Sequence, residues 1–150
     1  MKRIAIVGMS CRLPGADSPE ALWNMLCNGV NAVTEVPATR WNVDRFYHVD
    51  PKKAGAMYTI RGGFLDQVDQ FDAPCFGIAP REAIHMDPQQ RLILELAWEV
   101  FEDGGFPHHQ LAGSATGVFF GFGAMEYALT QLRHPELIDE IGRASCRERV

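Results

Sequence analysis

The stretch Asp87–Gly105, which reads DPQQRLILELAWEVFEDGG, constrains the fold more than any other part of the chain. Asp87 is suited to cap a helix, Pro88 suits its first position, and Gln90 stands three residues after the cap, so the three predict a capping box. Gly104 predicts the end of the helix. At about 1.5 Å per residue, the predicted helix is roughly 24 Å long.

Polar side chains occupy one narrow stripe of this predicted helix. They lie at i, i+4, i+8 and i+11, as Arg91, Glu95, Glu99 and Glu102. The other positions are mainly apolar: Leu92, Ile93, Leu94, Leu96, Trp98, Val100 and Phe101. A helix with a single buried face needs an apolar arc only about 100° wide. The wider arc predicts a helix packed between a sheet and a second layer.

Two continuous apolar runs predict buried strands of a parallel sheet, Ile4–Val7 before Gly8 and the segment TGVFFG at 116–121. Ser18, Pro19 and Glu20 predict the start of a helix that ends at Gly29, with Leu22, Trp23 and Leu26 as its inner face. The segment AVTEVP at 32–37 predicts a strand, and GGFLDQVDQFD at 62–72 a short extended pair. This order of elements predicts an α/β fold.

Composition and charge exclude several classes of protein. Hydrophobic residues make up 47% and charged residues 22% of the 150 residues, as in ordinary globular proteins. The net charge of -5 argues against nucleic acid as a partner. Arg12 interrupts the apolar N-terminal run before a signal peptide forms, and the longest apolar windows fall short of the ~18 to 20 residues that cross a bilayer. We therefore expect a cytoplasmic protein without a membrane segment.

The cysteines and histidines show no spacing typical of a metal site. Cys11, Cys27, Cys75 and Cys146 contain no Cys-x-x-Cys pair, and the first three are expected as buried, reduced thiols. The histidines are scattered, without an i, i+4 partner, and are expected at the surface: His48, His85, His108, His109 and His134. We expect no metal.

A dinucleotide-binding fold is the first enzyme class that the opening IAIVG segment suggests. The Rossmann fingerprint needs glycines two and five places after Gly8, where the chain has Ser10 and Leu13. A nucleotide-binding oxidoreductase is therefore a weak alternative. It would predict that a nicotinamide dinucleotide binds and protects the protein, which we do not expect.

Several motifs together resemble one enzyme family. They are FGIAPREAIHMDPQQRLILELAWEVFEDGG at 76–105, IAIVGMSCRLPGADSPEALWNML near the start, RW and GGFLDQVDQFD in the middle, and LAGSATGVFFG at 111–121. The sequence is similar to the N-terminal part of the β-ketoacyl synthase (ketosynthase) domain of modular, type I polyketide synthases, over about residues 3–135.

The resemblance implies a thiolase-like layered fold, of which only the first part of the N-terminal half is present. It also implies a homodimer that performs decarboxylative Claisen condensation of an acyl thioester with a malonyl-type extender. The partner is acyl carrier protein, whose phosphopantetheine arm carries the substrates, and no cofactor is expected on this segment. The parent pathway makes polyketides or fatty acids.

The catalytic residues that the resemblance implies are expected beyond the end of the chain. The family uses a cysteine nucleophile in a Thr-Ala-Cys-Ser-Ser type segment, followed by two histidines, and none of the four cysteines here has that context. We expect no catalytic residue in this chain, and an inactive fragment. A non-catalytic relative that acts as a structural or chain-length subunit is the alternative.

The resemblance also implies where the acyl pocket lies. In the family, the segment that follows the TGVFFG strand approaches that pocket, often across the dimer, and here it reads GFGAMEYA. Phe122, Met125 and Tyr127 are therefore the candidate substrate contacts. Packing at the end of a strand is the structural alternative for the same side chains.

The last ten residues, IGRASCRERV, differ in character from the rest. They can be encoded as ATC GGA AGA GCG TCG TGT AGG GAA AGA GTG, which resembles a sequencing-library adaptor, and they lack helical or strand periodicity. We expect residues 1–140 to be the N-terminal fragment of the ketosynthase domain and residues 141–150 to be a non-native tail. A solvated basic tail is the alternative.

Overall fold

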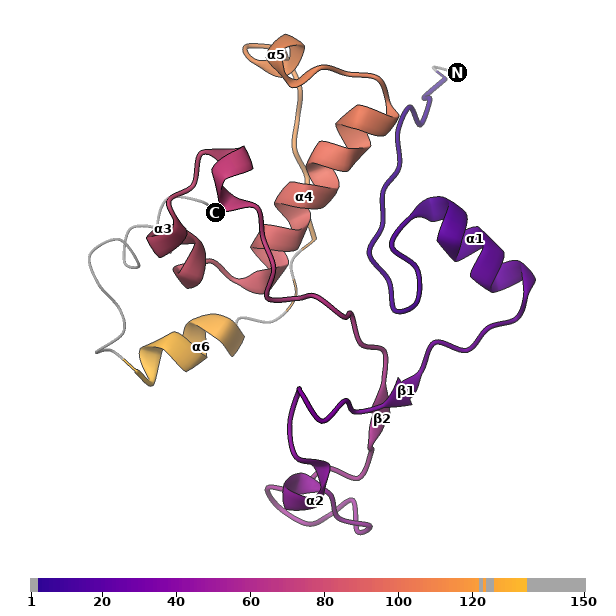
Figure 1. The fold of residues 1–150 in the computed structure, drawn as a ribbon, viewed down its shortest axis with the longest axis vertical. Helices are drawn as coiled ribbons and strands as arrows, with labels where there is room; N and C mark the ends of the chain where they lie inside the picture. The colour runs from indigo at the N-terminus through magenta and orange to yellow at the C-terminus, as the bar shows by residue number, and fades with distance from the viewer. Residues whose placement is uncertain (1–2, 122, 124–125, 135–150) are drawn as a thin grey trace. The chain divides into compact units, whose positions relative to one another are not determined.

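The computed structural model describes residues 3–121, 123 and 126–134 of the chain. The elements combine helices with a small sheet (Figure 1): α1 (Pro19–Cys27), β1 (Thr34–Glu35), α2 (Val43–Phe46), β2 (Arg61–Gly62), the 3-10 helix η1 (Ala73–Phe76), α3 (Pro80–His85), α4 (Pro88–Asp103), α5 (His108–Leu111) and α6 (Glu126–Leu132). They form two compact units. Unit 1 comprises residues 1–10 and 67–150, and unit 2 comprises residues 11–66.

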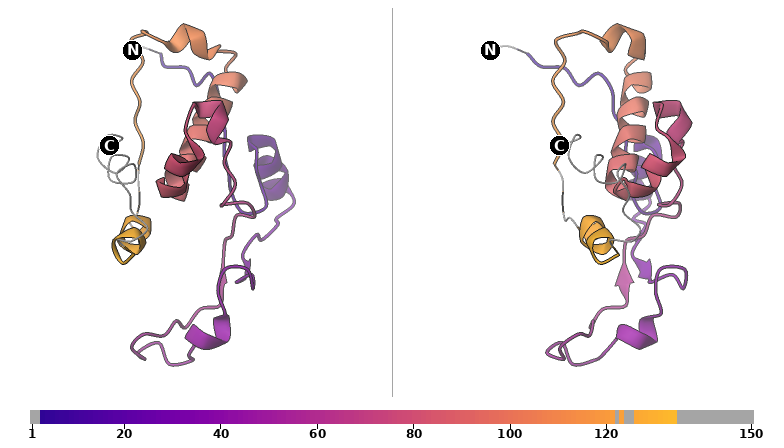
Figure 2. Two further views of the ribbon diagram at one scale, coloured as in Figure 1. Left: turned by 60° about the vertical axis from the view of Figure 1, so that its left-hand side comes forward. Right: turned by 90° about the vertical axis from the view of Figure 1, so that its left-hand side faces the viewer.

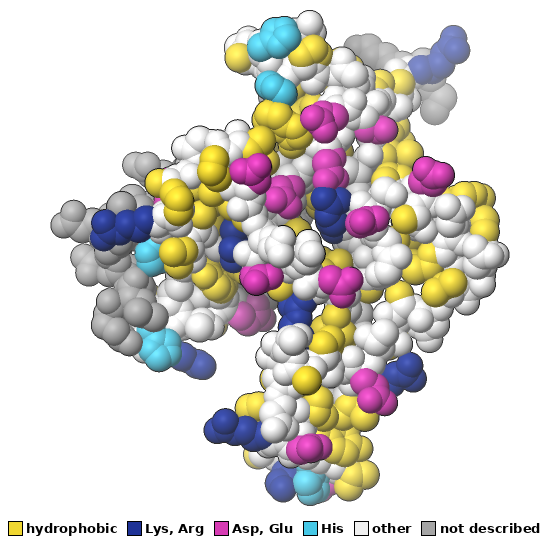
Figure 3. All heavy atoms as spheres, in the orientation of Figure 1, with side chains coloured by type: hydrophobic (Ala, Val, Ile, Leu, Met, Phe, Trp, Pro, Cys, Tyr) yellow, Lys and Arg dark blue, Asp and Glu magenta, His cyan; other side chains and the backbone are white. Residues whose placement is uncertain are grey.

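The predicted helix after Ser18 is confirmed as α1 in unit 2. Ser18 Oγ accepts a hydrogen bond from Ala21 N at 3.1 Å, and Pro19 stands in the first turn. The predicted inner face is wrong for Trp23 and Leu26, which are 66% and 62% exposed, whereas Leu22 is half-buried. The described residues leave Trp23 and Leu26 largely uncovered, and Figure 3 shows hydrophobic side chains exposed over α1.

A tight turn precedes α1. Leu13 and Ala16 exchange two backbone hydrogen bonds of 2.8 and 2.9 Å, with Pro14 and Gly15 between them. Gly15 has φ +75°, as the third residue of a type II turn requires, and proline is favoured at the second. The turn buries Ala16, which is 4% exposed.

The small sheet joins two distant parts of unit 2. β1 and β2 pair antiparallel, with Thr34 opposite Gly62 and Glu35 opposite Arg61. The strand predicted in AVTEVP is therefore confirmed over two residues, whereas the extended pair predicted at 62–72 is reduced to Gly62. The long segment between the strands forms α2 and a bridge of Tyr47 with Met57.

The predicted central helix is confirmed as α4 in unit 1. Asp87 Oδ1 accepts from Gln89 N at 2.8 Å, while Gln90 Oε1 accepts from Asp87 N at 3.3 Å, so the capping box is formed. Gly104 is the C-cap. Each residue from 88 to 101 is half-buried and none is fully buried, so the helix has neighbours on many sides but no complete cover.

The cap of α4 gives a testable stability prediction. Replacing Asp87 with alanine removes the acceptor for Gln89 N, so we expect the free energy of unfolding to fall by about 0.5–2 kcal/mol. Asp87→Asn is the matched control, because asparagine caps helices about as well as aspartate. Urea denaturation of the ketosynthase domain that contains this segment measures both. Equal losses in both variants would contradict the capping role.

The two predicted strands at 4–7 and 116–121 are wrong in this structure. Neither segment is paired, and Ile4 and Phe119 are 96% and 94% exposed. A strand needs a neighbour to accept its hydrogen bonds, and the described residues supply none for these two segments. The layered α/β sheet predicted from them is likewise not formed by the described residues.

The hydrophobic core of unit 1 is small. It consists of buried residues from η1, α3 and the turns beside them, Ala73, Ile78, Ala83 and Met86, with Phe71, Phe76 and Leu94 packed against them. The ribbon views show α3 beside α4 (Figures 1 and 2). Within the described ranges, no helix has both the length and the apolar character needed to cross a membrane.

Candidate functional site

The corner between α3 and α4 is the part of unit 1 around which a site can be built. Asp72 Oδ1 caps η1 by accepting from Cys75 N at 3.3 Å. Gly77, with φ +64°, then reverses the chain, and Ile78 N donates to Ala73 O at 3.0 Å. The reversal places Ile78 and α3 on the core, so hydrogen bonds and core packing fix the backbone between η1 and α3.

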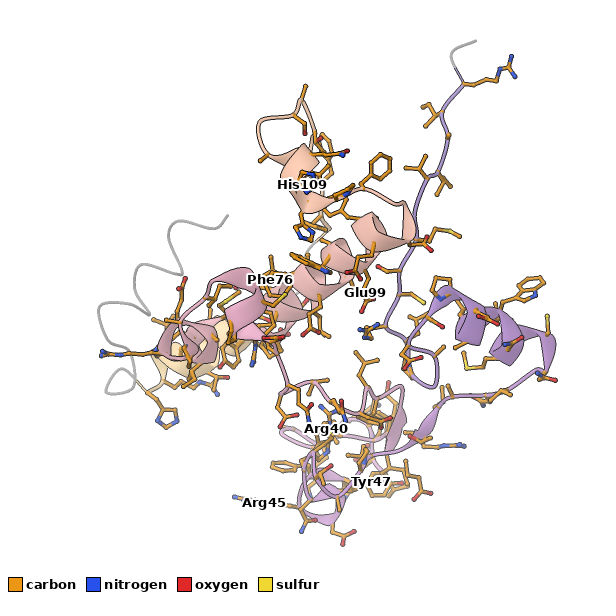
Figure 4. All side chains as sticks on the ribbon, turned by 45° about the horizontal axis from the view of Figure 1, so that its top comes forward. Arg40, Arg45, Tyr47, Phe76, Glu99 and His109 are labelled. Carbon is orange, nitrogen blue, oxygen red and sulfur yellow. The ribbon has the colours of Figure 1, made fainter. Side chains whose placement is uncertain are left out.

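A row of aromatic side chains connects η1 with α4 and α5. Phe71 stacks on Phe76 with ring centroids 5.4 Å apart, and Phe76 and Trp98 form a T-shaped pair with ring centroids 5.8 Å apart. The ring centroids of Trp98 and His108 lie 4.0 Å apart, and Trp98 Nε1 donates a hydrogen bond to Glu102 Oε1 at 2.9 Å. Figure 4 shows Phe76 beside α4. These aromatic contacts hold η1 and α5 against α4.

The end of α4 is held against the N-terminal segment. Met9 N donates to Asp103 Oδ2 at 2.8 Å, and Ser10 Oγ donates to Leu96 O at 2.8 Å. A Cβ at Gly8 would lie 2.4 Å from Val100 O, so only glycine fits this approach. Residues 8–10 are therefore fitted to α4 by close backbone contact.

Helix α6 is attached to the end of α3 by two side chains. Tyr127 Oη donates to Ile84 O at 2.6 Å, and Gln131 Nε2 donates to His85 O at 3.0 Å. Tyr127 and Gln131 are four residues apart and both half-buried, so they share one face of α6. These contacts bring the end of the GFGAMEYA segment to the corner between α3 and α4.

Of the three predicted substrate contacts, Phe122 and Met125 lie outside the described residues. Tyr127 is described, and its hydroxyl group bonds to Ile84 O. Gly123 lies near the start of α4, since a Cβ there would be 4.0 Å from Gln89 Oε1. Sequence reasoning missed Gln131, whose only signal was its i, i+4 spacing from Tyr127.

The described cysteine side chains differ in exposure. Cys11 is half-buried, while Cys27 and Cys75 are exposed, so the expected burial is wrong for the last two. Cys27 is the last residue of α1, which buries none of its residues, and on η1 it is Ala73 rather than Cys75 that is buried in the core. Among the described residues, no three His, Cys, Asp or Glu side chains converge as a metal site would require. His108, His109 and His134 are exposed, as predicted, whereas His48 and His85 are half-buried.

Comparison with known protein families shows the family to which this chain belongs. Residues 1–144 match the family described as "Beta-ketoacyl synthase, N-terminal domain". The chain belongs to the β-ketoacyl synthase family. Its similarity to polyketide synthases and to solved ketosynthase domains identifies it as a ketosynthase segment of a modular type I polyketide synthase.

Two mycobacterial proteins are similar to this ketosynthase segment. Both are subunits of the phenolphthiocerol/phthiocerol polyketide synthase of Mycobacterium tuberculosis. The segment is 45% identical over 137 residues to one of them, covering 91% of this chain and 8% of that protein. It is 47% identical over 137 residues to the other, covering 91% of this chain and 9% of that protein.

Two solved ketosynthases share its fold. A ketosynthase domain of the oxazolomycin system from Streptomyces albus has a TM-score of 0.81 at 38% identity, over 87% of this chain and 23% of that one. The ketosynthase from module 6 of the bacillaene synthase of Bacillus subtilis 168 has a TM-score of 0.75 at 38% identity, over 83% and 21%. The ketosynthase segment thus spans under a quarter of each relative.

Proposed function

We propose that the protein containing this segment is a β-ketoacyl synthase that extends acyl chains in a modular polyketide synthase. The observation that carries the proposal is the family match over residues 1–144, together with 45% identity to a polyketide synthase subunit. Decarboxylative Claisen condensation is the reaction. Acyl carrier protein delivers both substrates on phosphopantetheine, and two copies of the intact domain form a homodimer.

The reaction has two bond-forming steps. A cysteine thiolate attacks the acyl thioester, forming an acyl-enzyme and releasing the carrier thiol. The malonyl-type extender then loses CO₂, and the resulting carbanion attacks the acyl-enzyme carbonyl, which forms the new carbon–carbon bond and returns the cysteine thiol. Backbone donors stabilise the oxyanion in both steps. We place the cysteine and its two assisting histidines in the ketosynthase domain beyond this segment.

Phe122, Met125 and Tyr127 are the proposed contacts of the acyl chain. The attachment of α6 to the corner between α3 and α4 supports a fixed position for the end of this segment. Because the Tyr127 hydroxyl group bonds to Ile84 O, its ring is the part that we assign to the acyl chain.

Reading the source DNA past codon 140 and expressing the intact domain tests the proposed function. The purified domain, given an acyl thioester and malonyl-loaded acyl carrier protein, is expected to yield a β-ketoacyl product, detected by its mass. A residue other than cysteine in the Thr-Ala-Cys-Ser-Ser type segment, with no product formed, would instead support the non-catalytic structural or chain-length role. The same reading tests the proposal that residues 141–150, which lie outside the described residues, are encoded by adaptor DNA.

A further inference from the structure

The end of α3 presents two backbone acceptors that its own helix cannot satisfy. The last four carbonyl groups of a helix have no intrahelical partner, and Ile84 and His85 contribute two of them. The chain cannot continue as a helix, because Met86 and Asp87 are extended, with ψ 137° and 135°, and Asp87 precedes a proline. The Met-Asp-Pro sequence thus opens these carbonyls at a fixed place beside the core.

Side chains of α6 satisfy both acceptors. Tyr127 Oη reaches Ile84 O and Gln131 Nε2 reaches His85 O, at 2.6 and 3.0 Å. The leucines of α6 do not share this contact, since Leu129 and Leu132 are 56% and 68% exposed. Hydrogen bonds, rather than apolar packing by the leucines, therefore fix the register of α6 on α3.

We infer that Tyr127 and Gln131 act as a positioning pair for the proposed acyl-chain pocket, which we call the α6 latch. The inference rests on the proposed function, since it assigns the latch to the segment that we place at that pocket. Through the latch, α6 takes its position from Ile84 and His85 at the end of α3, and the next residue, Met86, is 3% exposed in the core. The Tyr127 hydroxyl group donates its only proton to Ile84 O, so it cannot also donate a hydrogen bond to the substrate.

Two substitutions in the intact ketosynthase domain test the latch. Tyr127→Phe and Gln131→Leu each remove one hydrogen bond and keep most of the side-chain volume. We expect amide hydrogen exchange in residues 126–134 to become roughly 2- to 10-fold faster in each variant. Arg133→Gln, on an exposed position of the adjoining turn, is the control, and its exchange is expected to match the unsubstituted domain.

The rate of condensation distinguishes a positioning role from a purely structural one, because loss of a purely structural contact would leave kcat of the folded domain unchanged. Because small displacements of a positioning segment slow bond formation, we expect kcat to fall by roughly 2- to 10-fold in both variants at a temperature where the domain is folded. The ratio of kcat/KM between a short and a long acyl thioester is expected to stay unchanged, since the hydroxyl group does not touch the substrate.

Three results would overturn the latch. They are exchange in Tyr127→Phe equal to that of the unsubstituted domain, an unchanged kcat in both variants, or a changed acyl-chain ratio with unchanged exchange, which would place the hydroxyl group on the substrate. An unsubstituted domain that never condenses refutes the proposed function instead. In that case, the exchange measurement alone decides whether the latch exists.

Discussion

Replacing Ile78 with alanine is expected to lower the free energy of unfolding of the ketosynthase domain by about 2–5 kcal/mol. Ile78 is 4% exposed and packs with Ala73, Ala83 and Met86 in the core of unit 1. The alanine leaves a cavity, which η1 and α3 cannot close without losing the hydrogen bond from Ile78 N to Ala73 O. Urea denaturation monitored by tryptophan fluorescence measures the change.

Ile84→Ala is the matched control for this cavity. Ile84 belongs to α3, which contributes to the same core, but its side chain is 65% exposed. Its carbonyl group remains available to Tyr127 after the substitution, so the latch is unaffected. We expect a change within about 0.5 kcal/mol, as for most surface substitutions. Similar losses at Ile78 and Ile84 would show that the core is placed wrongly.

Gly8→Ala is expected to destabilise the domain by about 1–3 kcal/mol through one added methyl group. The new Cβ would lie 2.4 Å from Val100 O and 3.0 Å from Gly104 N, which are backbone atoms at the end of α4. Either α4 or the N-terminal segment must move, and the movement strains the bonds of Met9 N to Asp103 and of Ser10 Oγ to Leu96 O.

Gly121→Ala is the control for the same chemical change. Apart from its chain neighbours, no atom of the described residues lies within 4 Å of a Cβ at Gly121, so the methyl group has open space there. Thermal unfolding of both variants compares them directly, and only Gly8→Ala is expected to lower the melting temperature. A neutral Gly8→Ala variant would contradict the close approach of residues 7–10 to α4.

The sequence predictions that the structure confirms depend mainly on residues close together in the chain. The capping box and the glycine stop of α4 depend on residues within a few positions of each other, and the structure forms them as predicted. The cap of α1 is local in the same sense. Family resemblance, which uses the order of many residues, was confirmed by the match over residues 1–144.

Non-local contacts account for the predictions that failed and for the contacts that were missed. The apolar runs at 4–7 and 116–121 read as strands, but a strand forms only beside a hydrogen-bonding neighbour, and the described residues provide none. Trp23 and Leu26 are exposed because the described residues supply no layer that packs against them. The bond from Tyr127 to Ile84 joins positions 43 residues apart through a backbone carbonyl, which no side-chain pattern indicates.

Acyl loading followed by intact-protein mass spectrometry is the most direct test of the central claim, that this chain is a ketosynthase segment whose reactive cysteine lies elsewhere in the domain. The intact domain, incubated with an acyl thioester, is predicted to gain one acyl group rapidly on one cysteine. The chain of residues 1–150 is predicted to gain acyl groups on its cysteines, among them the exposed Cys27 and Cys75, only at the slow rate of a free thiol such as glutathione. Rapid, stoichiometric loading of one cysteine in the 150-residue chain, followed by condensation with a malonyl-type extender, would contradict the claim.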